Sequence, residues 1–107
     1  MKKLKFGGNL PEKILSGMKT STWRVNDEKN IVVNDELSLC NLQSEEFARA
    51  IVTYVKETRF EDLTDKDWEG HEKYHSEEEM YREFSKMYKM EILPETKLKI
   101  IKFYIIK

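Results

Sequence analysis

The sequence predicts an α+β domain in which about five or six short strands curl into a small β-barrel with helices on its flanks. Segments with the two-residue alternation of strands stand near both ends of the chain. Segments with helical spacing lie between strand segments without a regular strand–helix–strand alternation, which argues against a parallel sheet. A chain of 107 residues has room for one hydrophobic core and not for a second, so we expect residues 1–107 to form a single domain.

The N-terminal part is expected to form a strand and then a short helix. Residues 2–6 alternate between polar and apolar side chains, as a half-buried strand does. Residues 10–16 predict a two-turn helix, because Asn9 can cap its start, Pro11 lies in its first turn and Gly17 can adopt the left-handed conformation that ends it. The side chains expected to face the core are Leu10, Ile14 and Leu15.

Three further strands are expected in the middle of the chain. Residues 20–25 are rich in β-branched and aromatic side chains. An Asn-Asp turn signal at 34–35 precedes the alternating residues 36–42, and residues 47–57 are the longest strand candidate. Cys40 has alternating apolar neighbours, so we expect a buried structural thiol.

The C-terminal half is expected to contain the clearest helix and a final strand. Residues 60–67 have the composition of a loop with a short helical turn. Ser76 and Glu79 form a capping box at the start of a helix. Pro94 closes that region, and residues 97–106 predict a final buried strand. The side chains of the helix expected to face the core are Met80, Phe84, Met87 and Tyr88.

Nothing in the sequence indicates secretion or a membrane. A single cysteine excludes an internal disulfide and fits a reducing compartment. No signal-peptide pattern follows Met1, and no apolar stretch approaches the roughly 20 residues that span a bilayer. We therefore expect a cytoplasmic monomer that does not contact membranes. Its enrichment in Lys and Glu is the composition trend of thermophile proteins.

Charge is unevenly distributed, although the formal net charge is only −1. Residues 1–24 are basic and residues 57–83 are acidic; the chain turns basic again at Lys97, Lys99, Lys102 and Lys107. If the two basic ends lie side by side, they form a local cationic face; otherwise each run is the solvated face of a strand or helix. A net charge near zero favours a small ligand over long RNA.

Residues 17–24, with the sequence GMKTSTWR, are the strongest candidate for a binding site. Alternation along the predicted strand places Thr20, Thr22 and Arg24 on one face, with a lysine at its entrance, and Trp23 on the opposite, core-facing side. Hydroxyls bind base edges, and a guanidinium binds phosphate or carbonyl oxygens. A solvent-facing edge strand would explain the polar face equally well.

This segment resembles the G-x-K-T-x-T-x-R signature of ASCH domains, which belong to the PUA-like superfamily of small β-barrels with flanking helices. The Asn-Asp turn, the strand over residues 47–55, the Glu-Gly pair at 69–70 and the later helix and strand follow in the family's order. We expect no cofactor. The resemblance implies binding of RNA, a nucleotide or a nucleoside or, as in some small bacterial members, hydrolysis of acetylcytidine to cytidine. The pocket residues would be Lys19, Thr20, Thr22 and Arg24.

The resemblance to these hydrolases also implies catalytic residues. The family's lysine and threonine correspond to Lys19 and Thr22. Its glutamate corresponds to Glu69, which stands before a glycine as in the family's pattern, with Glu72 as the second choice because the local spacing departs from those members. In such a site a desolvated Lys19 takes the proton of Thr22, which attacks the acyl carbon, while Glu69 orients the substrate amide or shuttles the proton. His71 would line the same pocket.

A zinc hydrolase is a further alternative, because His71, Glu72 and His75 match the H-E-x-x-H motif. That motif needs a helix to bring its histidines together on one face. Gly70 stands directly before it and Ser76, a helix cap, directly after it, so a continuous helix is not expected. A third ligand would have to come from beyond the next helix. We therefore expect two polar histidines and no metal.

Overall fold

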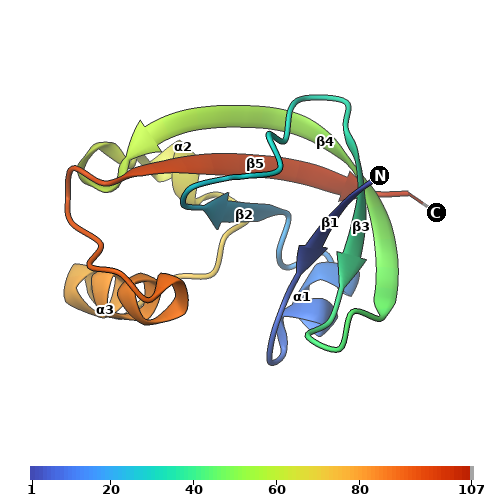
Figure 1. Cartoon of the computed structure of the whole chain (residues 1–107), viewed down its shortest axis with the longest axis horizontal. Helices are drawn as coiled ribbons and strands as arrows, with labels where there is room; N and C mark the ends of the chain where they lie inside the picture. Colours follow the sequence, from blue (N-terminus) through green and yellow to red (C-terminus); the bar gives the residue numbers. More distant parts are fainter. Residues whose placement is uncertain (107) are drawn as a thin grey trace.

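A computed structural model describes residues 1–106 of the chain. These residues fold around one curled sheet (Figure 1). Its five strands are β1 (Lys2–Lys5), β2 (Ser21–Arg24), β3 (Glu36–Cys40), β4 (Glu46–Arg59) and β5 (Lys97–Ile105). Their order across the sheet is β1-β3-β4-β5-β2. The β1–β3 pair is parallel, and the other neighbouring pairs are antiparallel. Each predicted strand is present within about two residues of its expected ends, which is the usual uncertainty of strand and helix boundaries.

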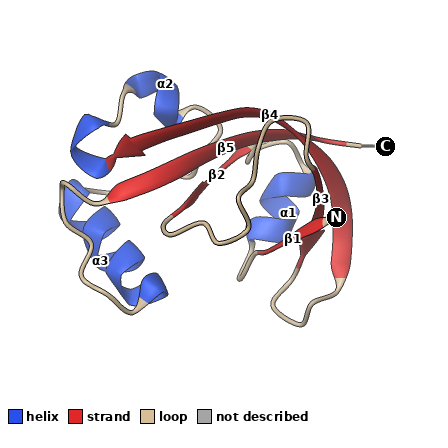
Figure 2. Cartoon of the chain, turned by 45° about the horizontal axis from the view of Figure 1, so that its top comes forward, coloured by secondary structure: helices blue, strands red, loops and turns tan. Residues whose placement is uncertain are grey.

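The helices lie at the two ends of the long strands β4 and β5 (Figure 2). Helix α1 (Leu10–Leu15) lies inside the curl near β1 and β3, whereas α2 (Asp65–Trp68) and α3 (Glu77–Tyr88) lie at the other end. A 3₁₀ turn over Phe60–Asp62 follows β4. No helix within residues 1–106 is long and apolar enough to cross a membrane. The predicted small barrel with flanking helices is therefore confirmed as a curled half-barrel.

The core has two clusters, one at each end of the long strands. Leu37, Leu39 and Val52 belong to the cluster beside α1, where Cys40 is also buried, as predicted. Trp23 and Phe84 belong to the second cluster, which packs beneath α3. β5 contributes to both clusters, with Ile101 and Phe103 in the first and Leu98 and Ile100 in the second.

The curl brings the two edge strands of the sheet towards each other. Among residues 1–106, β1 and β2 share no backbone ladder. Arg24 of β2 instead donates from Nη2 to the carbonyl oxygen of Lys5, at 3.3 Å, and its guanidinium lies 5.2 Å from the ring centre of Phe6. A side chain therefore closes the half-barrel where a closed barrel would have backbone hydrogen bonds.

Some of the predicted backbone signals are present, but the Asn9 side chain makes no cap hydrogen bond at the start of α1. Gly17 has φ +84°, and Asn34 in the turn before β3 has φ +77°; both are left-handed. The Ser76 hydroxyl caps α3 by accepting from the Glu79 N–H at 3.1 Å. Glu79 does not complete the capping box, because its carboxylate accepts from the N–H of His75 rather than from that of Ser76.

Two side chains expected in the core are exposed. Leu15 is 58% exposed, because α1 has only six residues and buries Ile14 instead. Met87 is 61% exposed, because the core-facing side of α3 is occupied by Met80 and Phe84. Met87 lies at the edge of the cavity described below.

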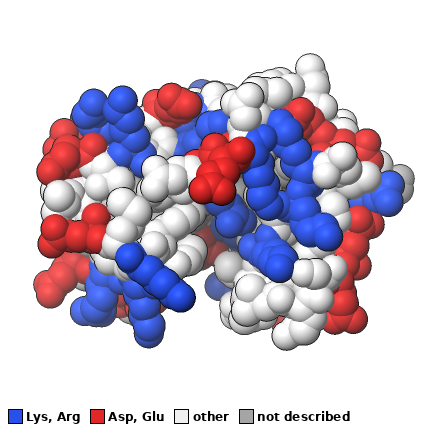
Figure 3. All heavy atoms as spheres, viewed as in Figure 1, with Lys and Arg blue, Asp and Glu red and all other residues white. Residues whose placement is uncertain are grey.

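On the face that Figure 3 shows, one group of basic side chains lies over the half of the molecule that contains β1, and others lie over the half that contains α3. Two of the C-terminal lysines are engaged elsewhere. Lys99 is buried, where its Nζ lies 2.8 Å from Asp27, and Lys102 lies over the ring of Tyr54. Lys97 is exposed, and Lys107 lies outside the described residues. Lys99 therefore adds no exposed charge to the basic group near β1.

Candidate functional site

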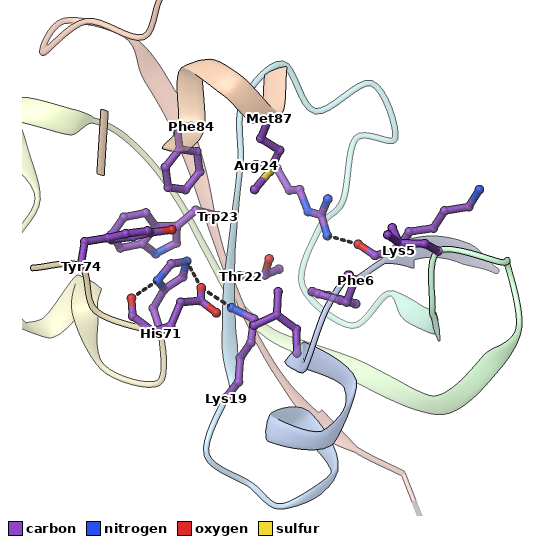
Figure 4. A pocket seen from close by; sticks show the side chains of 14 residues that line it. Lys5, Phe6, Lys19, Thr22, Trp23, Arg24, His71, Tyr74, Phe84 and Met87 are labelled. Atoms are coloured by element: carbon purple, nitrogen blue, oxygen red, sulfur yellow. Dashed lines mark hydrogen bonds and ion pairs between the residues drawn. The ribbon is translucent and has the colours of Figure 1, made fainter. Parts of the chain in front are cut away.

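A cavity of about 420 Å³ lies between the edge strands and the segment that precedes α3 (Figure 4). Its volume is within the range of small-molecule sites. The polar side chains that line it are Lys5, Lys19, Thr22, Arg24, His71 and Glu72. Elements far apart in the chain supply them, so the curl of the sheet creates the site.

Lys19 is the most deeply buried cationic side chain of the cavity. Only 2% of the residue is exposed, and its Nζ lies 2.9 Å from Oε1 of Glu72. Burial lowers the pKa of Lys19, while the charge and hydrogen bond of Glu72 act in the opposite direction. Lys19 is therefore a desolvated amino group whose charged form depends on one carboxylate.

Glu72 is the acid of the site. Its Oε1 faces both Lys19 and His71, and its Oε2 is buried without a hydrogen-bond partner among residues 1–106. Burial opposes ionisation of Glu72, but the contacts with His71 and then with Lys19 outweigh it and lower its pKa to about 2. The carboxylate is therefore ionised at neutral pH with one oxygen still free to accept.

A short backbone motif holds Glu72 in this place. Gly70 has φ +79°, and its carbonyl oxygen accepts from the N–H groups of Thr20 and Ser21 at 2.9 and 3.1 Å. These bonds attach the segment after α2 to the start of β2. The chain then continues through His71 to Glu72, which brings the carboxylate to Lys19, 53 residues away in sequence.

Aromatic side chains form one wall of the cavity. The His71 ring stacks on Trp23 with a centroid distance of 4.0 Å and an interplanar angle of 19°. Tyr74 and Phe84 stand beside them, and Phe6 lies on the opposite side (Figure 4). Trp23 is buried in the second core cluster, as expected, and it lines the cavity as well.

Arg24 borders the cavity at the β1 edge. Its Nε is buried and lacks a partner among the described residues. Burial lowers the pKa of Arg24, but an arginine side chain keeps its charge in proteins. Thr22 is also buried, with 5% exposed, and lines the same space.

Two of the residues predicted for the site lie outside the cavity lining. Thr20 is exposed, and its Oγ1 faces Gly70 rather than the cavity. Glu69 is exposed at the end of α2, so Glu72 is the glutamate beside Lys19. The family resemblance favoured Glu69 because it stands before a glycine, but the left-handed turn at Gly70 places Glu72 beside Lys19 instead. Phe6, Tyr74 and Met87 were not predicted for the site, since no local pattern marks side chains that meet only through tertiary packing.

The H-E-x-x-H match does not form a zinc site in this geometry. Helix α2 ends at Trp68 and α3 begins at Glu77, so the motif is not helical. His71 is buried against Glu72, whereas His75 is exposed. Within residues 1–106, no group of three or more His, Cys, Asp or Glu side chains is arranged to hold a metal ion.

Comparison with known proteins identifies the fold. No family model matches the sequence, and no curated protein matches it significantly. Protein EF3133 from Enterococcus faecalis V583, described by the family model DUF984, is similar with a TM-score of 0.79 and 18% identity, over 99% of this chain and 76% of that one. An ASCH domain from Lactobacillus crispatus JV V101 gives a TM-score of 0.69 and 14% identity, over 97% and 79% of the two chains. The hypothetical protein PH0355 gives a TM-score of 0.72 and 20% identity, over 99% of this chain and 100% of that one.

These similarities extend over nearly the whole chain, and they agree with the strand order and helix positions described above. Identities this low carry information about the fold and not about the ligand. The chain therefore has the fold of an ASCH domain, a small α+β half-barrel.

Proposed function

We propose that the cavity binds a single nucleoside or nucleotide through its base. The observation that carries this proposal is the Glu72 carboxylate, whose Oε2 is buried without a partner among residues 1–106 while Oε1 is shared by Lys19 and His71. A buried acceptor without a donor costs roughly 1–3 kcal/mol, so a ligand that supplies an N–H group there is favoured. Nucleobases carry such N–H groups on their edges.

The walls of the cavity support a flat aromatic ligand. Trp23, His71 and Tyr74 stand on one side, and Phe6 stands on the other. Unpaired bases bind proteins by stacking on aromatic rings while their edges make hydrogen bonds. The combination of aromatic walls with one buried carboxylate fits a base better than it fits an aliphatic ligand.

The β1 edge of the cavity supports binding of an oxygen anion. Arg24 has an unpartnered Nε among the described residues, and the exposed Lys5 lines the same cavity. A guanidinium binds phosphate oxygens in pairs. We therefore expect Arg24 to contact the phosphate of a nucleotide whose base lies near Glu72. The net charge of −1 favours such a small ligand over long RNA.

Calorimetric titration with cytidine and with cytidine monophosphate tests this function. Glu72→Gln keeps the size of the side chain but removes its charge, and it should weaken binding roughly tenfold or more. Glu69→Gln, the same change on an exposed neighbour outside the cavity, should leave binding unchanged. The proposal fails if the wild-type protein binds neither compound, or if the two variants bind alike.

Hydrolysis of an acylated pyrimidine nucleoside is a second candidate. It is favoured by one observation, the presence of Lys19, Thr22 and Glu72 around a single cavity. Burial lowers the pKa of Lys19, which favours the neutral amine that can act as a base. Thr22 carries a buried hydroxyl that can act as the nucleophile.

In this reaction Lys19 takes the proton of Thr22 as Oγ1 bonds to the acyl carbon. The carbon–nitrogen bond then breaks, and the leaving nitrogen receives that proton, which releases the nucleoside amine. Water attacks the resulting ester, releases the carboxylic acid and restores the Thr22 hydroxyl. Glu72 orients the amide through a hydrogen bond to Oε2.

Release of cytidine from acetylcytidine tests the second candidate. Thr22→Val should abolish turnover, Thr22→Ser should retain part of it, and Thr20→Val, an exposed position outside the cavity, should retain most of it. If the wild-type protein binds cytidine but releases none from acetylcytidine, hydrolysis of this substrate is excluded and the binding function stands.

A further inference from the structure

His71 makes two contacts that a neutral imidazole cannot make together. Its Nδ1 lies 2.7 Å from the backbone oxygen of Glu72, and its Nε2 lies 2.8 Å from Oε1 of the same residue. Both partners are acceptors, whereas a neutral ring has one N–H. A neutral ring therefore supplies a proton for only one of these contacts. Both can be hydrogen bonds at the same time only when a second proton is shared between the ring and the Glu72 carboxylate.

The ring of His71 has no freedom to avoid this conflict. Its side chain is 3% exposed, and it is stacked against Trp23. Trp68 packs edge-on at 6.0 Å, and Tyr74 lies at 6.3 Å on the same side of the fold. Its backbone follows Gly70, which is attached to β2. Neither the ring nor its backbone can turn away without opening the second core cluster.

His71 also determines which carboxylate oxygen of Glu72 can accept a hydrogen bond from a ligand. Its Nε2 and the Lys19 Nζ both converge on Oε1, so Oε2 is the remaining acceptor. Without a donor at the Nε2 position, only the flexible Lys19 side chain would hold this carboxylate. The contacts of His71 therefore select one orientation of Glu72 among its rotamers.

We propose that His71 is a positioning residue, which holds the Glu72 carboxylate with Oε1 on Lys19 and Oε2 available to the ligand, most firmly when its ring carries both protons. This inference rests on the proposed function only in its reference to a ligand. The hydrogen-bond relationship between His71 and Glu72 can be tested without one.

The neighbouring charges determine the direction of the pH dependence. The charged groups that act on His71 are Glu72 on its own segment and Lys19 from the start of β2; its other close neighbours are the uncharged rings of Trp23 and Trp68. Tyr74 stays neutral, because burial raises its pKa. Burial lowers the pKa of His71, although Glu72 acts against that shift. The doubly protonated ring therefore forms on the acid side of neutrality, and above its pKa one of the two hydrogen bonds is lost.

Nuclear magnetic resonance tests the relationship on the wild-type protein without ligand. In a pH titration, the ¹⁵N signals of the His71 ring should show both nitrogens protonated in acid. The ¹³C signal of the Glu72 carboxyl should change at the same midpoint, well above the pKa of Glu72 itself, which is about 2. If His71 loses its proton and Glu72 shows no change at that pH, the positioning role is wrong.

Two variants then separate positioning from packing, with cytidine as the probe between about pH 5 and 8. His71→Gln can donate to Oε1 but does not titrate, so it should bind within a few-fold of wild type and lose the rise in affinity towards acid. His71→Phe keeps a ring against Trp23 without any N–H, so it should bind roughly tenfold more weakly. His75→Gln is the matched control at the exposed histidine and should behave as wild type.

The outcomes distinguish this inference from the proposed function. If His71→Gln or His71→Phe keeps both the affinity and the pH dependence of wild type, His71 does not position Glu72. If wild type fails to bind cytidine, the proposed function is wrong for that compound, and the ligand-free titration alone decides the role of His71. If His71→Phe does not fold, His71→Gln alone tests the positioning role: loss of the pH dependence of binding supports it, and an unchanged pH dependence rules it out.

Discussion

Gly70 lies so close to Thr20 that a Cβ atom on the glycine would stand 2.1 Å from the threonine Oγ1. The two residues also share a backbone hydrogen bond, from the Thr20 N–H to the Gly70 carbonyl oxygen at 2.9 Å. This contact attaches the segment that contains His71 and Glu72 to the strand that follows Lys19. The assembly of the candidate site depends on it.

Gly70→Ala is therefore expected to be destabilising by about 1–3 kcal/mol, because the substitution combines a left-handed φ with a steric overlap. The matched control is Gly17→Ala, whose φ of +84° is similar to the +79° of Gly70 but which has no atom within 4 Å of the added Cβ. Urea unfolding of both variants measures the difference. Equal losses of stability would mean that the contact with Thr20 is unimportant.

Stability should decrease as pH falls, for two separable reasons. Glu72 has a folded pKa of about 2 against an ordinary 4.5, so the stability it contributes is complete above 4.5 and is lost between 4.5 and 2. His71 has a pKa below its ordinary 6.5, so the unfolded chain binds that proton more readily and stability already declines below 6.5. Unfolding free energies measured across this range should follow both steps.

Glu72→Gln should reduce the lower of these two steps, since glutamine does not titrate, and Asp27 and Asp67, whose pKa values are also lowered, should account for the remaining decline. Glu69→Gln should follow the wild-type curve, because Glu69 is exposed and outside the cavity. A wild-type curve without any decline between pH 4.5 and 2 would contradict the low pKa of Glu72.

Arg24→Ala should weaken the binding of cytidine monophosphate roughly tenfold and the binding of cytidine much less. The substitution removes a charge-assisted hydrogen bond to the phosphate, whereas the contacts with the base remain. The dependence of nucleotide affinity on salt concentration should also become shallower. Arg82→Ala on the exposed side of α3 is the control. Equal losses for nucleoside and nucleotide would indicate that Arg24 acts on the fold, through its bond to Lys5, and not on the phosphate.

Asp67→Ala should lower the unfolding free energy by about 1–3 kcal/mol, because one buried carboxylate satisfies several groups. Its Oδ2 accepts from the N–H of Thr64 at the start of α2, and its Oδ1 lies 3.0 Å from Nζ of Lys56. Asp65→Ala changes an exposed acid in the same helical turn and should cost much less. Thermal denaturation of the two variants provides the comparison.

The sequence by itself determined the strands, the helices and one face of the candidate site. Gly17, Asn34 and Ser76 act on backbone groups within a few residues, so their effects are visible in the chain. Alternation along β2 likewise placed Thr22 and Arg24 on one side and Trp23 in the core, but it also placed Thr20 beside them, and Thr20 lies outside the cavity lining. The exposed Leu15 and Met87 show the limit of this reasoning, since an apolar stripe does not say how wide the opposing surface is.

Tertiary structure alone decided which acid joins Lys19. Glu69 and Glu72 are both plausible by spacing, but the left-handed turn at Gly70 and its bonds to β2 leave Glu69 in solvent and carry Glu72 inward. The same packing set His71, which was expected to line the pocket, between Trp23 and Glu72. These relationships join segments about fifty residues apart through burial and hydrogen bonding, and no local pattern encodes contacts over such a separation.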